Sequence, residues 1–124
     1  MNSRYRPEDA LTQACAQWIE IQRLKDPRYK LIFSVQNERK VSPREGRLWN
    51  KRGRQKGVSD WIILCSSADG RYTGGAIELK AGKNKLTEHQ REFLNIAYNN
   101  GNAVAVCRSF DAFQKLITNY MEGI

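Results

Sequence analysis

Apolar residues near the start of the chain recur at helical spacing. Leu11, Cys15 and Trp18 lie three or four residues apart, which places them on one face of a helix. Pro7 suits the first turn of such a helix, and an Asp-Pro step interrupts the pattern further on. We therefore predict a helix over residues 7–24.

Three later segments have the composition of strands. Residues 30–36 are rich in β-branched and aromatic side chains and predict the first strand. Residues 58–66 and 72–80 predict two more, and the Asp69-Gly70 pair between them favours a hairpin. The second and third strands should therefore be antiparallel.

The remaining pattern predicts a helix, a strand and a final helix. Thr87 and Gln90 have the spacing of a capping box, and Gly101 can end the helix that they begin. The unbroken apolar run 103–107 is typical of a strand buried on both faces, and apolar spacing over 110–120 predicts the last helix. The order αβββαβα predicts an α/β fold in a single domain, residues 1–124.

Charge is concentrated in the polar segment 37–56. Eight of its residues are Lys or Arg and two are Glu, so six of the chain's eight net positive charges lie there. With Pro43, Gly46 and Gly53 included, we expect a basic loop at about 38–56, of a length that is uncommon unless functional. The charge favours a polyanionic partner, nucleic acid before a membrane.

Other features of the composition narrow the class of protein. Cys15, Cys65 and Cys107 lack the paired spacing of a zinc site and sit in apolar segments, so we expect reduced core thiols. No apolar run approaches the roughly 20 residues that span a bilayer. We expect a cytoplasmic protein, in the host cell's cytoplasm if it is viral, with no membrane partner.

Two carboxylates and a lysine stand at the ends of predicted buried strands. Glu78 and Lys80 are two residues apart, so both project from one face of their strand. Asp60 lies at the mouth of the neighbouring strand. Asp60 and Glu78 can bind a hard divalent cation, with the carbonyl of Leu79 as a further ligand, and Lys80 can orient or deprotonate a water. These groups suit phosphodiester hydrolysis.

The predicted hairpin must be irregular for these groups to meet. A strict two-residue turn at Asp69-Gly70 pairs Asp60 with Leu79, which sends Asp60 to the wrong face. A longer loop, or a bulge at residues 74–75, would correct the parity.

Asp60 followed by Glu78-Leu79-Lys80 resembles the PD-(D/E)xK nuclease signature. Four surrounding segments are similar to the VRR-NUC family: 57–60, 77–82, 86–90 and 101–109. Two departures occur, because Ser59 replaces the usual proline and Val106-Cys107-Arg108 replaces the Val-Arg-Arg for which the family is named.

This resemblance implies a restriction-endonuclease-like αβββαβ core with a four-stranded mixed sheet flanked by helices. It also implies an endodeoxyribonuclease dependent on Mg²⁺ or Mn²⁺, acting as a homodimer on branched DNA such as four-way (Holliday) junctions. A flap- or duplex-cutting nuclease and a non-catalytic nucleic-acid-binding module are the alternatives.

Several site residues keep two interpretations. The resemblance places Glu8 at the metal and Gln90 at the catalytic centre, whereas Glu8 can simply favour the helix N-terminus and Gln90 can simply complete the capping box. Arg108 can bind phosphate or pair with a carboxylate at the end of the sheet. The residues that we expect to contact DNA are Arg39, Lys40, Arg47, Lys51, Arg52, Arg54, Lys56, Lys83 and Lys85.

Overall fold

Four strands form one mixed sheet in the order β1-β2-β3-β4. The computed structural model describes residues 7–35 and 42–124, apart from the side chains of residues 49 and 50. The strands are β1 (Ile32–Ser34), β2 (Trp61–Ile63), β3 (Gly74–Leu79) and β4 (Asn102–Cys107). β2 is antiparallel to both β1 and β3, and β4 runs parallel to β3.

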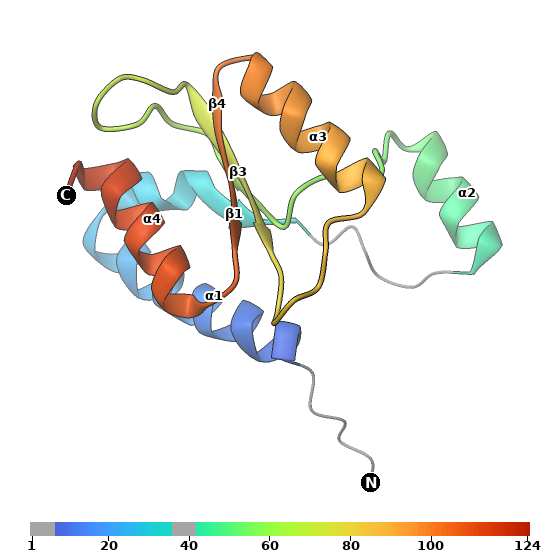
Figure 1. Cartoon of the computed structure of the whole chain (residues 1–124), viewed down its shortest axis with the longest axis horizontal. Coiled ribbons are helices and arrows are strands. Elements are labelled where there is room, and N and C mark those ends of the chain that lie inside the picture. Colours follow the sequence, from blue (N-terminus) through green and yellow to red (C-terminus); the bar gives the residue numbers. More distant parts are fainter. Residues whose placement is uncertain (1–6, 36–41) are drawn as a thin grey trace, which may run out of the picture.

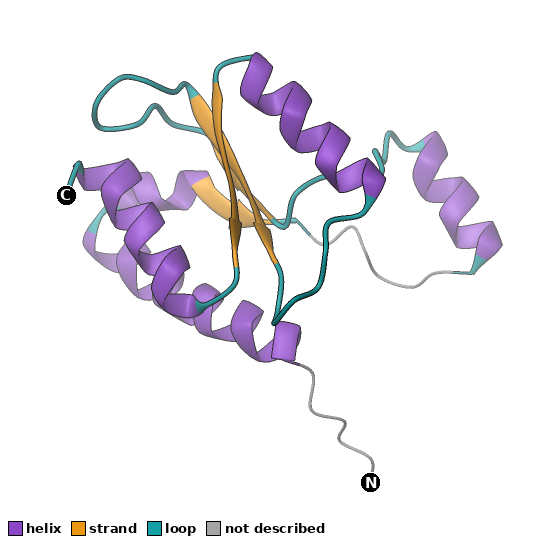
Figure 2. Cartoon of the chain, in the orientation of Figure 1, coloured by secondary structure: helices purple, strands orange, loops and turns teal. Residues whose placement is uncertain are grey.

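Helices cover both faces of this sheet. Helices α1 (Pro7–Lys25) and α4 (Phe110–Glu122) lie side by side on one face, and α3 (Glu88–Asn99) lies on the other (Figures 1 and 2). The predicted α/β class and the four-stranded mixed sheet are confirmed.

The main core lies between the sheet and the α1–α4 layer. Trp61 of β2 packs on Phe113 of α4 with 5.3 Å between ring centroids. Cys15, Ile19 and Ile77 are buried in the same cluster. Because strand side chains alternate between faces, burial of Trp61 and Ile77 here directs Asp60 and Glu78 to the α3 face.

Capping residues define where two of the helices begin. Thr87 and Gln90 form the predicted capping box of α3. Ser109 caps α4 by accepting the Ala112 N–H at 3.1 Å, and Gly123 ends that helix in the left-handed conformation. The helices expected over residues 7–24, between the Thr87 cap and Gly101, and over 110–120 are confirmed as α1, α3 and α4.

The β2–β3 connection is longer than a tight hairpin. Trp61 pairs with Ile77, and residues 64–73 link the two strands. The Asp-Gly turn exists inside this link, where the Gly70 N–H donates to the Ser67 carbonyl at 2.9 Å. The antiparallel pairing is confirmed, a strict two-residue hairpin does not form, and the longer loop that the site requires is present.

Part of the segment expected as a loop is a helix, α2 (Pro43–Lys51). Its start has a Ser-Pro-Arg-Glu sequence, in which the Ser42 hydroxyl accepts the Glu45 N–H at 3.1 Å. This is the S-x-x-E capping signature with proline at the first helical position, so the local sequence did contain the signal. Figure 1 shows α2 standing away from the sheet, beyond α3.

The first strand is shorter than expected. A 3₁₀ helix, η1 (Pro27–Leu31), occupies the start of the predicted segment, because the Asp26 carboxylate accepts the Arg28 N–H at 3.0 Å and caps it. The strands predicted over 58–66 and 72–80 are likewise reduced to β2 and β3.

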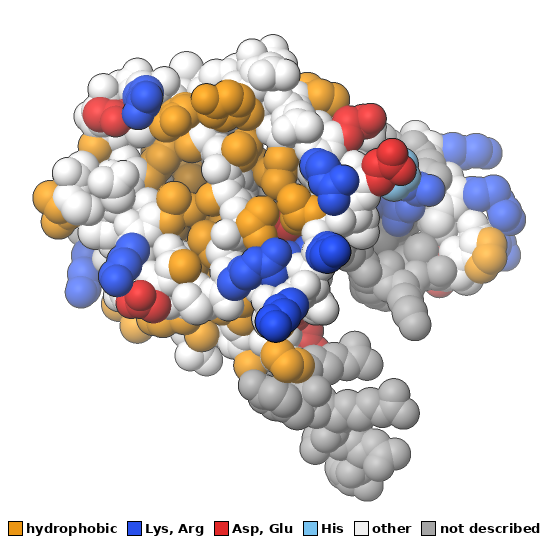
Figure 3. Space-filling view, in the orientation of Figure 1, with side chains coloured by type: hydrophobic (Ala, Val, Ile, Leu, Met, Phe, Trp, Pro, Cys, Tyr) orange, Lys and Arg blue, Asp and Glu red, His pale blue; other side chains and the backbone are white. Residues whose placement is uncertain are grey.

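The last strand is not buried on both faces. It ends the sheet order, and only Cys107 is buried while residues 102–106 are half-buried. Figure 3 shows apolar side chains gathered on this side, between α3 and α4. The three cysteines are free, as expected. No helix in the described residues is long and apolar enough to cross a membrane.

Candidate active site

Asp60 and Glu78 come from neighbouring strands and face the same side of the sheet. One step beyond the Trp61–Ile77 pair, the β2–β3 register sets Asp60 opposite Glu78. The Asp60 carboxylate Oδ2 accepts the Leu79 N–H at 2.7 Å, which ties it to the residue after Glu78. The two acids predicted to meet are therefore brought together at the end of the β2–β3 ladder.

Lys80 follows on the same side, directly after β3. Glu78 is 1% exposed and Lys80 is 9% exposed, so both lie in a site largely closed to water. The Lys80 N–H donates to the Cys107 carbonyl at 3.0 Å, which joins its backbone to the end of β4. Burial of charged groups is costly unless they interact with one another or with ligands, so this pair is a candidate for a functional site.

Gln90, in the first turn of α3, contacts the Glu78 carboxylate. Its Nε2 donates to Glu78 Oε1 at 3.2 Å, and its Oε1 accepts the Thr87 N–H at 2.9 Å. Gln90 is 1% exposed. The capping-box interpretation is confirmed, and the same amide also contacts Glu78. The catalytic role of Gln90 stays a prediction.

Glu8 reaches the same end of the sheet from the first turn of α1. Its Oε1 accepts the Ala81 N–H at 3.3 Å and the Asn84 side-chain N–H at 3.2 Å. It therefore contacts the residue after Lys80, beside an open hollow that Asp9 and Lys83 also line. Asn84 is a partner that sequence reasoning missed, since nothing in its local sequence points to residue 8.

The donor set is that of a hard cation. Across residues 7–35 and 42–124, no three His, Cys, Asp or Glu side chains come together as a metal-binding group. Asp60 and Glu78 instead supply a pair of carboxylates. The Leu79 N–H points at Asp60, and its carbonyl is directed to the same side because both groups of a strand residue point the same way. Mg²⁺ commonly takes one or two carboxylates and completes its shell with waters and phosphates, so the residues fit.

The end of β4 contributes an arginine in an unexpected role. Arg108 Nη1 donates to the carbonyls of Gly82 at 3.0 Å and Asn84 at 2.7 Å. The predicted pairing with a carboxylate is wrong, since the acceptors are backbone carbonyls of the loop after Lys80. The neighbouring Cys107 thiol stays protonated at neutral pH, because burial raises its pKa to about 11.

The expected DNA-contacting residues fall in three places. Arg39 and Lys40 lie outside the described residues. Arg47, Lys51, Arg52 and Lys56 are exposed in or after α2, and Lys83 and Lys85 are exposed in the loop after the site, whereas Arg54 is half-buried. The described members are thus available to a polyanion at the surface, with Arg54 the most enclosed of them.

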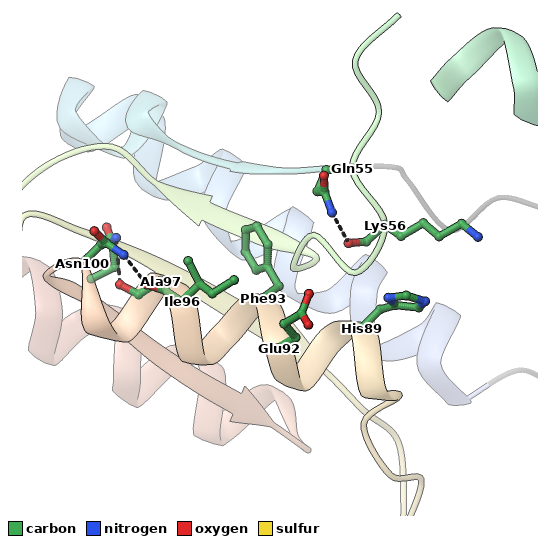
Figure 4. A pocket seen from close by; sticks show the side chains of 9 residues that line it. Gln55, Lys56, His89, Glu92, Phe93, Ile96, Ala97 and Asn100 are labelled. Atoms are coloured by element: carbon green, nitrogen blue, oxygen red, sulfur yellow. Dashed lines mark hydrogen bonds between the residues drawn. The ribbon is translucent and has the colours of Figure 1, made fainter. Parts of the chain in front are cut away.

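A separate groove of about 500 Å³ lies between α3 and the chain at residues 55–56 (Figure 4). Phe93, Ile96 and Ala97 give it an apolar lining, while Lys56 and Glu92 are the charged residues among its lining side chains. Asp60, Glu78 and Lys80 do not line it. The groove is therefore distinct from the candidate active site.

A mixed four-stranded sheet with Asp60 beside Glu78-Leu79-Lys80 defines a nuclease-type domain of the PD-(D/E)xK superfamily. The VRR-NUC domain model matches residues 6–111, and the chain belongs to that family. It is also similar to a solved structure described as a VRR_NUC domain protein, with 23% sequence identity and a TM-score of 0.78, over 97% of this chain and 92% of the other. A search of curated proteins found no match.

Proposed function

We propose that this protein is a Mg²⁺- or Mn²⁺-dependent endonuclease that hydrolyses phosphodiester bonds in DNA. The observation that supports this most directly is the pairing of Asp60 with Glu78 on one face, with Lys80 buried two residues further on. A protein that only binds nucleic acid gains nothing from two carboxylates beside phosphates.

Each residue has a distinct task in this proposal. Asp60, Glu78 and the Leu79 carbonyl would hold the ion. Glu8 does not form a three-carboxylate group with Asp60 and Glu78, and its contacts with Ala81 and Asn84 give it a place at the edge of the site. The ion supplies Lewis-acid polarisation of the phosphate and a more acidic water. The Lys80 ammonium orients the attacking water and offsets negative charge that builds up on the phosphate oxygens. Gln90 keeps the Glu78 carboxylate oriented.

Branched DNA, such as a four-way junction, is the proposed substrate. Its arms present strands related by two-fold symmetry, which a two-fold homodimer with two sites would match. The basic residues of 39–56, with Lys83 and Lys85, would contact phosphates, so binding should weaken steeply as salt rises.

Cleavage of labelled four-way junction, flap and linear duplex DNA tests the proposal. Native protein is compared with Lys80→Ala at matched salt, in Mg²⁺, Mn²⁺ or chelator. Lys115→Ala is the control, because Lys115 is an exposed α4 residue paired with Asp111. We expect metal-dependent junction nicking that Lys80→Ala abolishes without loss of binding.

Other outcomes would change the conclusion. Preferential cutting of flaps or linear duplex would keep the nuclease and reject the junction substrate. Binding without cutting of any substrate would favour a non-catalytic module. Sedimentation of the native protein tests the dimer independently, and a monomer at working concentration would reject the two-fold arrangement.

A further inference from the structure

The loop after Lys80 is held at almost every residue. The Lys80 N–H donates to the Cys107 carbonyl at 3.0 Å, and the Ala81 N–H donates to Glu8 at 3.3 Å. The Gly82 and Asn84 carbonyls accept from Arg108. Gly82 has a φ of 56°, so the chain turns sharply between these contacts. Support therefore comes from α1 on one side and from the end of β4 on the other.

We propose that Arg108 is a positioning residue that fixes this loop, and through it Lys80 and Glu8, in the geometry that catalysis needs. Its guanidinium donates to two carbonyls two residues apart, which spans the turn at Gly82. Asn84 shares both supports, because its carbonyl accepts from Arg108 and its side-chain amide donates to Glu8. Loss of Arg108 would therefore loosen the loop and release Glu8.

A direct role of Arg108 in binding phosphate is the competing explanation. Arg108 is exposed, and Lys83 and Lys85 lie in the loop that it holds. The two roles differ in what they require. A phosphate contact needs mainly the positive charge, whereas the clamp needs the two N–H groups of Nη1, fixed in the guanidinium plane, to reach both carbonyls. Arg108→Lys keeps the charge but replaces this rigid planar donor with a freely rotating ammonium on a shorter side chain.

The first arm of the test measures the loop itself and needs no activity. Amide hydrogen exchange at Lys80 and Ala81 is followed in native protein, Arg108→Lys, Arg108→Ala and Arg71→Ala. Arg71 is an exposed arginine that precedes the first residue of β3, at the end of the strand far from Lys80. Its removal therefore controls for the change in net charge. We expect exchange about tenfold faster in both Arg108 variants, through local opening of the loop. Unchanged exchange would overturn the proposal.

The second arm uses the proposed nuclease activity. For both Arg108 variants we expect junction affinity and its salt dependence close to native, with kcat lower by about tenfold because small misplacements of reacting groups are costly. A phosphate contact predicts instead that Arg108→Ala weakens binding and lowers the salt slope by about one, while Arg108→Lys stays near native. That result, with normal exchange, would reject the clamp.

This inference rests on the proposed function for its catalytic part only. If native protein cuts no DNA, the proposed function fails, and the exchange measurements still decide whether Arg108 holds the loop.

Discussion

The Gln90 side chain joins the first turn of α3 to the Glu78 carboxylate. Its Nε2 lies 3.2 Å from Glu78 Oε1 while its Oε1 accepts the Thr87 N–H. Capping uses the oxygen of this amide, so its nitrogen must face Glu78. The side-chain amide of Gln90 therefore both caps α3 and orients Glu78, a candidate metal ligand.

Gln90→Glu should separate these two tasks. Glutamate is a usual capping-box residue at this position, so the helix start should be retained. The new carboxylate would face Glu78 without a donor, and we expect cleavage to fall by about 10- to 100-fold, as for other groups that orient metal ligands. Single-turnover cleavage with matched DNA-binding assays measures this, and native rates in Gln90→Glu would show that the amide contact is dispensable.

Gly57 sets how closely the chain before Asp60 approaches α3. Its φ is 81°, and a Cβ added there would collide with the His89 backbone. Gly57→Ala should therefore lower the free energy of unfolding by more than the roughly 1–2 kcal/mol that an ordinary residue loses in the left-handed conformation.

Gly53→Ala is the matched control for this prediction. Gly53 has a φ of 94° and nothing within 4 Å of an added Cβ, so only the conformational cost applies. Urea unfolding of both variants measures the difference. Equal losses would mean that the chain near Gly57 shifts to accommodate the methyl group without energetic cost.

Buried thiols should make the fold sensitive to alkali. Burial raises the pKa of Cys15 from 9.0 to about 12, with a smaller contribution from Cys107, and burial raises the pKa of Cys107 to about 11. The folded protein therefore favours the protonated form of both thiols. Their contribution to the free energy of unfolding is fully present below about pH 9, near the pKa of an unfolded thiol. It is lost as the pH rises towards the pKa values of the folded state.

Urea unfolding between pH 7 and 11 tests this pH dependence. We expect the free energy of unfolding to fall above about pH 9, and Cys107→Ala to reduce the slope of that fall even though the variant is less stable at pH 7. A slope that Cys107→Ala leaves unchanged would assign the alkaline loss to other groups, such as Tyr120, whose pKa burial raises to about 12.

Metal binding should stabilise the native protein. An ion that binds the folded state alone adds about 2.7 kcal/mol at 100 times its dissociation constant. We expect Mg²⁺ or Mn²⁺ to raise the melting temperature of native protein and chelator to reverse it. Asp60→Asn keeps an oxygen for the Leu79 N–H but lacks the charge, so its melting temperature should not respond. An equal response in both proteins would place the ion elsewhere.

Local patterns in the sequence were sufficient for the elements whose determinants are near in the chain. Apolar spacing and caps predicted α1, α3 and α4, and alternation predicted that Glu78 and Lys80 share a face. Even α2 was encoded locally, by Ser42 and Glu45, although the surrounding charge and glycines favoured a loop.

Tertiary structure decided the features that depend on residues far apart in the sequence. The Asp60–Glu78 pairing followed from a loop that shifts the β2–β3 register, and a shift of one residue would have moved Asp60 to the other face. The apolar run of β4 indicated burial, but its place at the sheet edge leaves it half-exposed. The contacts of Glu8 with Asn84 and of Arg108 with Gly82 join residues that no short-range pattern connects. They form only when α1 and the end of β4 pack around the loop after Lys80.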